Sequence, residues 1–200
     1  VIFKVVEKNK NHCVVRVIYG GVVGSNKAVN VSRHIKLNRI TQKDILAIEI
    51  GKQMNIKNYA LSFANSLEDV IEIKKRLNKE DTLISKIESY NGLMNLNEIV
   101  KVTDEILIDR GDLSREVSLA KIPFLQRRIV AHTKSKGKPV HVATNLLESM
   151  NSNSLPTRAE INDVVSTLLM GADGLVLASE TAIGIFPVES VRIINQLINE

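Results

Sequence analysis

Two charged residues, Lys86 and Glu88, stand near the end of the apolar segment 83–89, which reads LISKIES. If this segment is a β-strand, the two side chains point to one face because successive residues alternate, and Ile87 points to the opposite, packed face. A cation and a carboxylate at the carboxyl end of a parallel strand lie where barrel enzymes carry their active sites. The same spacing also fits an ordinary ion pair at a strand end, and the residues alone do not decide between the two interpretations.

A second candidate segment, 106–113, runs from an apolar strand into a charged turn and reads ILIDRGDL. Gly111 allows the backbone either to approach a ligand closely or to adopt a positive φ. Asp112 then lies at the end of the strand. Together with Glu88 from the neighbouring unit it could bind one Mg²⁺ ion, which typically takes one or two protein carboxylates. The alternative is a turn whose aspartate caps the next segment, since Asp and Gly are common in turns.

A third candidate is Thr144, which ends the apolar segment 140–144 and offers a hydroxyl as both donor and acceptor. His141 is expected to point away from the side of Thr144 and to be packed or partly exposed. Downstream, Thr157 and Glu160 have the spacing of a capping box at the start of a helix. A structural role therefore competes with a functional one at these two positions.

The elements that would position these residues alternate between strand and helix from about residue 41 onward. Thr41 is expected to cap a helix that runs to Met54. The expected strands are 59–63, 83–87, 106–109, 140–144 and 174–178, and the helical segments that follow them are 67–77, 93–100, 119–135, 159–170 and 188–198. Such alternation predicts parallel βαβ units. The number of strands fits either part of an eight-stranded barrel or an open doubly wound sheet.

The first 30 residues have a different pattern. Two β-branched segments, 1–6 and 12–19, flank the polar stretch 8–11 and predict a β-hairpin, and glycines at 20, 21 and 24 mark a turn after it. We therefore expect residues 1–30 to be the tail of a small β module, separate from the α/β region at 31–200.

The composition argues against several classes of function. The chain has 200 residues and a net charge of +5, and only 4% of its residues are aromatic. Nucleic-acid grooves need aromatic side chains among their cations, so we expect no nucleic-acid binding, and the modest positive charge suits an anionic substrate. No apolar stretch of about 18 residues occurs, which argues against a transmembrane helix.

The single cysteine and the first residue indicate the cellular compartment and the processing of the chain. Cys13 has no partner for an intrachain disulfide, so a reducing cytoplasm is expected. The chain starts at Val1 without a signal-peptide pattern, and we expect a fragment or a processed chain.

The motifs of this chain, taken together, resemble those of pyruvate kinases. The segment 83–93, with its Ser-Lys-Ile-Glu-Ser core, is similar to the signature strand of that family. The segment 24–30 is similar to the family's exit from an inserted β domain, and Ser62-Phe63 is similar to the next strand end. The remaining motifs occur in family order: Arg110–Leu113, Ala143-Thr144 with 147–150, Pro156–Glu160, 171–174, Ser179–Ala182 with Gly184, and Pro187–Glu189.

The resemblance implies a fold and an activity. The fold is a (β/α)₈ TIM barrel of which residues 31–200 hold about five C-terminal βα units, preceded by a remnant of the inserted β domain at residues 1–30. The activity is phosphoryl transfer from phosphoenolpyruvate to ADP, giving pyruvate and ATP, in a cytoplasmic homotetramer. Mg²⁺ or Mn²⁺ is implied at the site, and so is K⁺, whose ligands are not in this chain. The 200 residues alone are therefore expected to be inactive.

Each site residue receives an expected role from its place in the motifs. Lys86 would stabilise the transferring phosphoryl group and the enolate, and Glu88 and Asp112 would bind the metal. Backbone N–H groups around Gly111 and Asp112 would hold the substrate carboxylate together with Thr144. Lys86 and Thr144 are the expected catalytic residues.

The chain also departs from the family pattern. Asp109 replaces a small alanine and puts a carboxylate beside the substrate's backbone cradle, so it counts as a further substrate-binding position. The other departures are Asn65 for an arginine, Ser114 for a glycine, Asn145 for a glutamine and Ala178 for a serine.

Two further hypotheses follow from these departures and from the strand-end carboxylates. A non-catalytic domain of the same family would bind ligands or act as a scaffold. A Mg²⁺-dependent lyase barrel acting on pyruvate or phosphoenolpyruvate would also place a Glu and an Asp on neighbouring strands, but the motifs at 156–160 and 179–182 argue against it.

Overall fold

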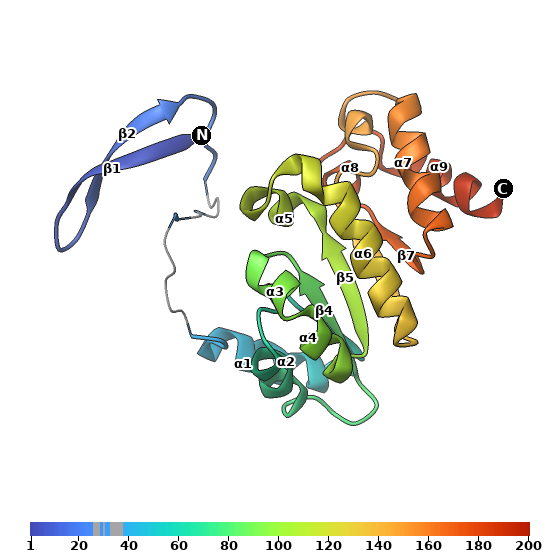
Figure 1. Cartoon of the computed structure of the whole chain (residues 1–200), viewed down its shortest axis with the longest axis horizontal. Helices are drawn as coiled ribbons and strands as arrows, with labels where there is room; N and C mark the ends of the chain where they lie inside the picture. The colour runs from blue at the N-terminus through green and yellow to red at the C-terminus, as the bar shows by residue number, and fades with distance from the viewer. Residues whose placement is uncertain (26–28, 30, 33–37) are drawn as a thin grey trace. The chain divides into compact units, whose positions relative to one another are not determined.

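The computed structural model describes residues 1–25, 29, 31, 32 and 38–200 (Figure 1). The chain divides into two compact units, Val1–Lys36 and Leu37–Glu200. The expected boundary at residue 30 and most of the motif at 24–30 lie outside the described residues. Within the described part of the chain, none of the helices combines the length and apolar character needed to cross a membrane.

The first unit contains a β-hairpin, as predicted. Strands β1 (Ile2–Lys8) and β2 (Cys13–Tyr19) pair antiparallel, with Val5 opposite Val15. All residues of both strands are exposed. This exposure follows from the architecture, because a two-stranded ribbon has no second layer against which to bury its apolar side chains.

The second unit is built on a parallel sheet of five strands in the order β3-β4-β5-β6-β7. The strands are Asn58–Leu61, Thr82–Ile87, Glu105–Asp109, Val140–Ala143 and Gly174–Val176. Their spatial order follows the sequence without a reversal, whereas a doubly wound sheet reverses its order at a switch point. For the described strands, the prediction of a partial barrel is confirmed and the doubly wound alternative is wrong.

Helices connect these strands and cover one face of the sheet. Helix α6 packs on β5 and β6, and contacts between α2 and α4 and between α4 and α6 place these helices in a row (Figure 1). The helices are α1 (Gln42–Gln53), α2 (Leu67–Lys74), α3 (Tyr90–Met94), α4 (Leu96–Val102), α5 (Arg110–Glu116), α6 (Ile122–Ser135), α7 (Arg158–Leu169), α8 (Ser179–Ala182) and α9 (Pro187–Asn199), with short 3₁₀ turns η1 (Leu119–Lys121) and η2 (Glu148–Asn151).

Several helix boundaries carry the expected capping residues. Thr41 caps α1 in a capping box, and Thr157 forms the predicted box with Glu160 at the start of α7. The single helix expected at 93–100 is instead two helices, α3 and α4, which meet at Asn95. The side chain of Asn95 donates to the carbonyl of Asn65 at 2.8 Å, which ties this break to the loop after β3.

The main core lies between the sheet and its helices. Alternate residues of the strands point into it, and Leu83, Ile87, Ile106 and Ile108 are fully buried. Burying each such side chain contributes about 1.5–3 kcal/mol. The intervening residues therefore point to the opposite face of the sheet, where the charged side chains of β4 and β5 lie.

Two aspartates fix strand register at the amino ends of β5 and β7 by the same contacts. Asp104 accepts from the backbone N–H of Leu83 at 2.9 Å and pairs with Lys74 at 2.6 Å. Asp173 accepts from the N–H of Val140 at 2.8 Å and pairs with Lys134 at 2.6 Å. Each carboxylate thus joins the start of one strand to its neighbour and to a helix.

Candidate active site

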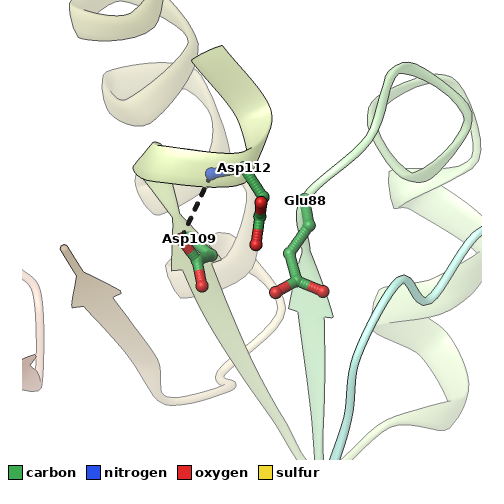
Figure 2. Close-up of side chains that lie close together, drawn as sticks. All are labelled: Glu88, Asp109 and Asp112. Carbon is green, nitrogen blue, oxygen red and sulfur yellow. Dashed lines mark hydrogen bonds between the residues drawn. The ribbon is translucent and has the colours of Figure 1, made fainter. Parts of the chain in front are cut away.

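Three carboxylates come together at the carboxyl ends of β4 and β5. Figure 2 shows Glu88, just after β4, close to Asp109 at the end of β5 and Asp112 in the first turn of α5. One oxygen from each carboxylate lies within 4.8 Å of the others. Glu88 is 1% exposed and Asp109 is 7% exposed, whereas Asp112 is half-buried.

Lys86 stands among these carboxylates. Its Nζ lies 2.6 Å from Glu88 Oε1 and 3.2 Å from Asp109 Oδ2. The structure thus brings Lys86 and Glu88 together on one face of the sheet, opposite the buried Ile87. Burial works to lower the pKa of Lys86, but the hydrogen bonds and charges of Glu88 and Asp109 outweigh it, so the pKa lies above the usual value and the side chain is an ammonium at neutral pH.

A backbone group from the loop after β3 also contacts Glu88. The N–H of Phe63 donates to Glu88 Oε2 at 2.5 Å, and Phe63 has a φ of 51°. Burial raises the pKa of Glu88, and the hydrogen bonds from Lys86 and Phe63 offset that rise only in part. This role of Phe63 could not be predicted from the sequence, because the group that acts is a backbone N–H and no residue type indicates it.

A hydrogen bond between Gly111 and Thr144 lies beside these charged side chains. The N–H of Gly111 donates to Thr144 Oγ1 at 2.7 Å, and the Thr144 hydroxyl has Asp109 Oδ1 at 3.2 Å and the carbonyl of Ala143 at 2.6 Å as acceptors. Gly111 does not adopt a positive φ; its role is close approach, because a Cβ there would lie 3.3 Å from Thr144 Oγ1. Thr144 itself has a φ of 68°, a costly conformation for a β-branched residue.

The conformation of Thr144 is held by Arg110, a residue to which the sequence analysis gave no role. The guanidinium donates to the carbonyl of Thr144 from Nε at 3.1 Å and from Nη2 at 2.7 Å, and to the carbonyl of Asn145 at 2.9 Å. Asn145 also has a positive φ, 53°. A pair with Asp163 at 2.6 Å balances the charge of this buried arginine.

The prediction of a charged turn after β5 was wrong. Residues Arg110–Glu116 form helix α5, with Asp109 as its N-cap; the Asp109 side chain accepts from the N–H of Asp112 at 3.5 Å. Asp112 lies close to Glu88 (Figure 2), and its Oδ1 pairs with Arg115 at 2.9 Å.

The donor set fits a hard divalent cation. An octahedral Mg²⁺ site needs oxygen ligands roughly 2.1 Å from the metal, which places neighbouring oxygens about 3 Å apart and opposite ones about 4 Å apart. The three carboxylate oxygens lie within 4.8 Å of one another, so small side-chain shifts would bring them into that range. Carboxylates are the ligands that suit Mg²⁺ and Mn²⁺.

The other positions singled out from the sequence have local roles in the structure. His141 is partly exposed and bonds Glu105 at 2.8 Å. Asn145 donates from Nδ2 to Glu148 at 2.8 Å. Glu160 adds to its capping box two hydrogen bonds from Ser149, so a structural role accounts for its contacts.

Departures from the family pattern at the remaining positions also have local contacts. Asn65 accepts a short hydrogen bond from the hydroxyl of Ser89. Ser114 donates to the carbonyl of Gly111 at 2.8 Å within α5. Ala178 precedes α8 without a side-chain cap.

Comparison with known proteins gives a consistent set of relatives. A family model described as "Pyruvate kinase, barrel domain" matches residues 1–191. A pyruvate kinase of Dictyostelium discoideum is 43% identical over 199 residues, covering 98% of this chain and 39% of that protein. A pyruvate kinase of Thermotoga maritima is 36% identical and is covered to 44%, and one of Clostridium perfringens is 38% identical and is covered to 42%. The chain thus spans about two fifths of the length of these relatives.

Proposed function

Because the chain belongs to the pyruvate kinase family, we propose that it carries part of a site for phosphoryl transfer from phosphoenolpyruvate to ADP. In this reaction the bond between phosphorus and the enol oxygen breaks, and a bond forms between phosphorus and a terminal oxygen of ADP. The electron pair left on the enol oxygen becomes an enolate, which takes up a proton at its methylene carbon to give pyruvate. Catalysis of such a transfer consists mainly of positioning and charge neutralisation.

The observation that carries the proposal is the partly buried ammonium of Lys86 among carboxylates from two neighbouring strand ends. Lys86 is held by Glu88 at 2.6 Å, so its charge is positioned before any ligand binds. It would neutralise negative charge on the phosphoryl group in flight and on the enolate oxygen. We assign Lys86 as a catalytic residue on this basis.

Thr144 and the neighbouring backbone groups are assigned to substrate binding. The N–H of Gly111 donates to the hydroxyl of Thr144, and the N–H of Asp112 donates to Asp109. These groups lie at the end of β5 and would orient the substrate carboxylate. The strained backbone at Thr144 supports this role, since such conformations persist where the surrounding structure enforces them and cluster at functional sites. Thr144 is therefore also assigned as a catalytic residue.

Glu88 and Asp112 would hold a divalent cation, Mg²⁺ or Mn²⁺. When bound there, such an ion supplies Lewis-acid neutralisation of the substrate oxygens. Glu88 is fixed for this purpose by the N–H of Phe63, and Asp112 by its place in the first turn of α5. K⁺ is proposed as a further requirement of the full-length gene product.

Three further parts of the proposal rest on family membership. Residues 1–30 would be the tail of the inserted β domain, and residues 31–200 would be part of the barrel domain. The active protein would be a cytoplasmic homotetramer, in which the segment at 156–160 lies at a subunit contact. Analytical ultracentrifugation of the full-length gene product tests the tetramer directly.

A coupled assay of pyruvate formation from phosphoenolpyruvate and ADP, with Mg²⁺ and K⁺, tests the activity in the full-length gene product. We expect Lys86→Met to lower kcat by about a hundredfold to a thousandfold. The matched control is Lys101→Met, which removes an exposed lysine paired with Glu98 on α4, and it should leave kcat unchanged. Turnover that survives Lys86→Met would refute the role of Lys86.

A second candidate function is binding without catalysis. It is favoured by Asp109, which places an additional carboxylate within 3.2 Å of the ammonium that would act on the substrate. This function predicts no turnover by the full-length gene product while Mg²⁺-dependent binding of phosphoenolpyruvate persists. Equilibrium binding measured beside the coupled assay distinguishes the two functions.

A further inference from the structure

The carboxylate of Asp109 contacts three donor groups at the carboxyl end of β5. Its Oδ2 lies 3.2 Å from Lys86 Nζ. Its Oδ1 lies 3.2 Å from the hydroxyl of Thr144 and 3.5 Å from the N–H of Asp112. Both oxygens of this one carboxylate thus lie within hydrogen-bond distance of groups that an incoming anion would need, although the hydroxyl of Thr144 also has the carbonyl of Ala143 as an acceptor at 2.6 Å.

We propose that Asp109 determines ligand specificity by acting as an internal carboxylate that competes with the carboxylate of an anionic ligand for these donors. The inference rests on the proposed function, which assigns the same donors to the substrate. The side chain is well placed to compete, because it is almost buried and is fixed by contacts at both oxygens. An anionic ligand has to displace it or to bind without those donors.

Charge strengthens this competition. Lys86 and Arg115, which pairs with Asp112, contribute two positive charges, while Glu88, Asp109 and Asp112 contribute three negative charges, so the group carries a net charge of about −1 when all are ionised. An approaching anion is repelled by this charge, and the repulsion is strong in a partly buried site where the effective dielectric constant is low. A divalent cation is attracted by the same charge, and Asp109 offers it a third carboxylate beside Glu88 and Asp112.

Asp109 therefore affects cations and anions in opposite directions. Removing its charge should weaken the binding of a divalent cation and strengthen the binding of a small carboxylate anion. A variant that merely damages the fold would weaken both, and a residue outside the site would change neither. This opposite pair of effects is the signature of the proposed role.

The test uses isothermal titration calorimetry on the full-length gene product with two probes, Mn²⁺ alone and then oxalate at saturating Mn²⁺. The informative variant is Asp109→Asn, which removes the charge and keeps an oxygen to accept from the N–H of Asp112. We expect the Kd for Mn²⁺ to rise about tenfold and the Kd for oxalate to fall about tenfold. Asp173→Asn removes a carboxylate at the amino end of β7 and should change neither Kd.

Each outcome decides the inference. Oxalate affinity that is unchanged or weaker in Asp109→Asn, with a circular dichroism spectrum like that of the wild type, would overturn it. If wild-type protein turns over phosphoenolpyruvate and oxalate affinity still does not rise in the variant, this inference fails while the proposed function stands. If wild-type protein shows no turnover but the two Kd values shift in opposite directions, the inference stands and the catalytic proposal fails. Failure of wild-type protein to bind Mn²⁺ at all would overturn the metal site and the inference together.

Discussion

Replacement of Arg110 by methionine should destabilise the Leu37–Glu200 unit more than a change at any exposed arginine. The guanidinium is 8% exposed and makes hydrogen bonds to the carbonyls of Thr144 and Asn145, to Gln126 and to Asp163. Methionine fills much of the same volume, so the loss is one of polar contacts rather than of packing. The carbonyls of Thr144 and Asn145 would then be left without these donors while both residues keep their positive φ.

The size of this effect follows from the burial of the partners. Removing one member of a buried ion pair costs about 3–5 kcal/mol of the free energy of unfolding. Asp163 is 41% exposed and regains water when Arg110 is lost, so we expect the lower end of that range, about 3 kcal/mol. For a unit of this size the loss corresponds to a fall in Tm of roughly 6–12 °C.

Thermal and urea unfolding followed by far-ultraviolet circular dichroism measures this loss. Arg192→Met is the matched control, since Arg192 is 75% exposed and its nearest carboxylate oxygen is 4.0 Å away; it should cost less than about 0.5 kcal/mol. A loss below about 1 kcal/mol for Arg110→Met would show that the two carbonyls do not depend on the guanidinium. The explanation given for the conformation of Thr144 would then be wrong.

Three further predictions concern the scaffold. The pKa values of Asp104 and Asp173 are lowered, because hydrogen bonds and charge from their lysine and backbone partners outweigh the opposing effect of burial. Their stabilisation is therefore fully present above the unfolded pKa of about 4 and is lost as the pH falls through the lowered folded values. We expect Asp104→Asn and Asp173→Asn each to lower the free energy of unfolding by about 1 kcal/mol at pH 7. Urea titrations should also show a flatter decline of stability below pH 4 in both variants. An unchanged decline would contradict the stabilising role of these carboxylates. Ile106→Ala should cost about 2–5 kcal/mol in urea unfolding because the side chain is fully buried, against less than about 0.5 kcal/mol for the exposed Ile185→Ala. Thr157→Ala should lower the free energy of unfolding by about 1 kcal/mol because the helix cap is lost, whereas Thr157→Ser should keep the cap and its stabilisation. Equal stability of the wild type and both variants would exclude the capping box as a source of stability.

Several expected elements match the structure because a local pattern encodes them, although the helix expected at 93–100 is two helices. Strand β4 was expected at 83–87 and spans Thr82–Ile87, because alternation of buried and partly exposed residues is a local signal. The cap of α7 was visible as a threonine and a glutamate three residues apart. Helix α5 was missed because its first turn, Arg110-Gly111-Asp112, has the composition of a loop, and the side chain of Asp109 supplies the cap that makes it a helix.

The candidate site was predictable only in part. Lys86 and Glu88 could be placed together from their spacing on a strand, and Asp112 could be placed near them from the parallel order of the strands. The pairing of Asp109 with Lys86 depends on the register of β4 against β5, in which Lys86 is aligned with Leu107, and no local pattern reveals that register. The contacts of Arg110 with the carbonyls of Thr144 and Asn145 connect residues more than 30 positions apart and need the folded structure.

We propose that Glu88 and Asp112 hold a divalent cation beside Lys86, and anomalous diffraction from Mn²⁺-soaked crystals of the full-length gene product would locate that ion. We predict an anomalous peak about 2 Å from one oxygen of Glu88 and one oxygen of Asp112. The peak should vanish in Glu88→Gln. A peak at some other group of residues, or none at Mn²⁺ concentrations that saturate pyruvate formation, would show that Glu88 and Asp112 do not hold the metal.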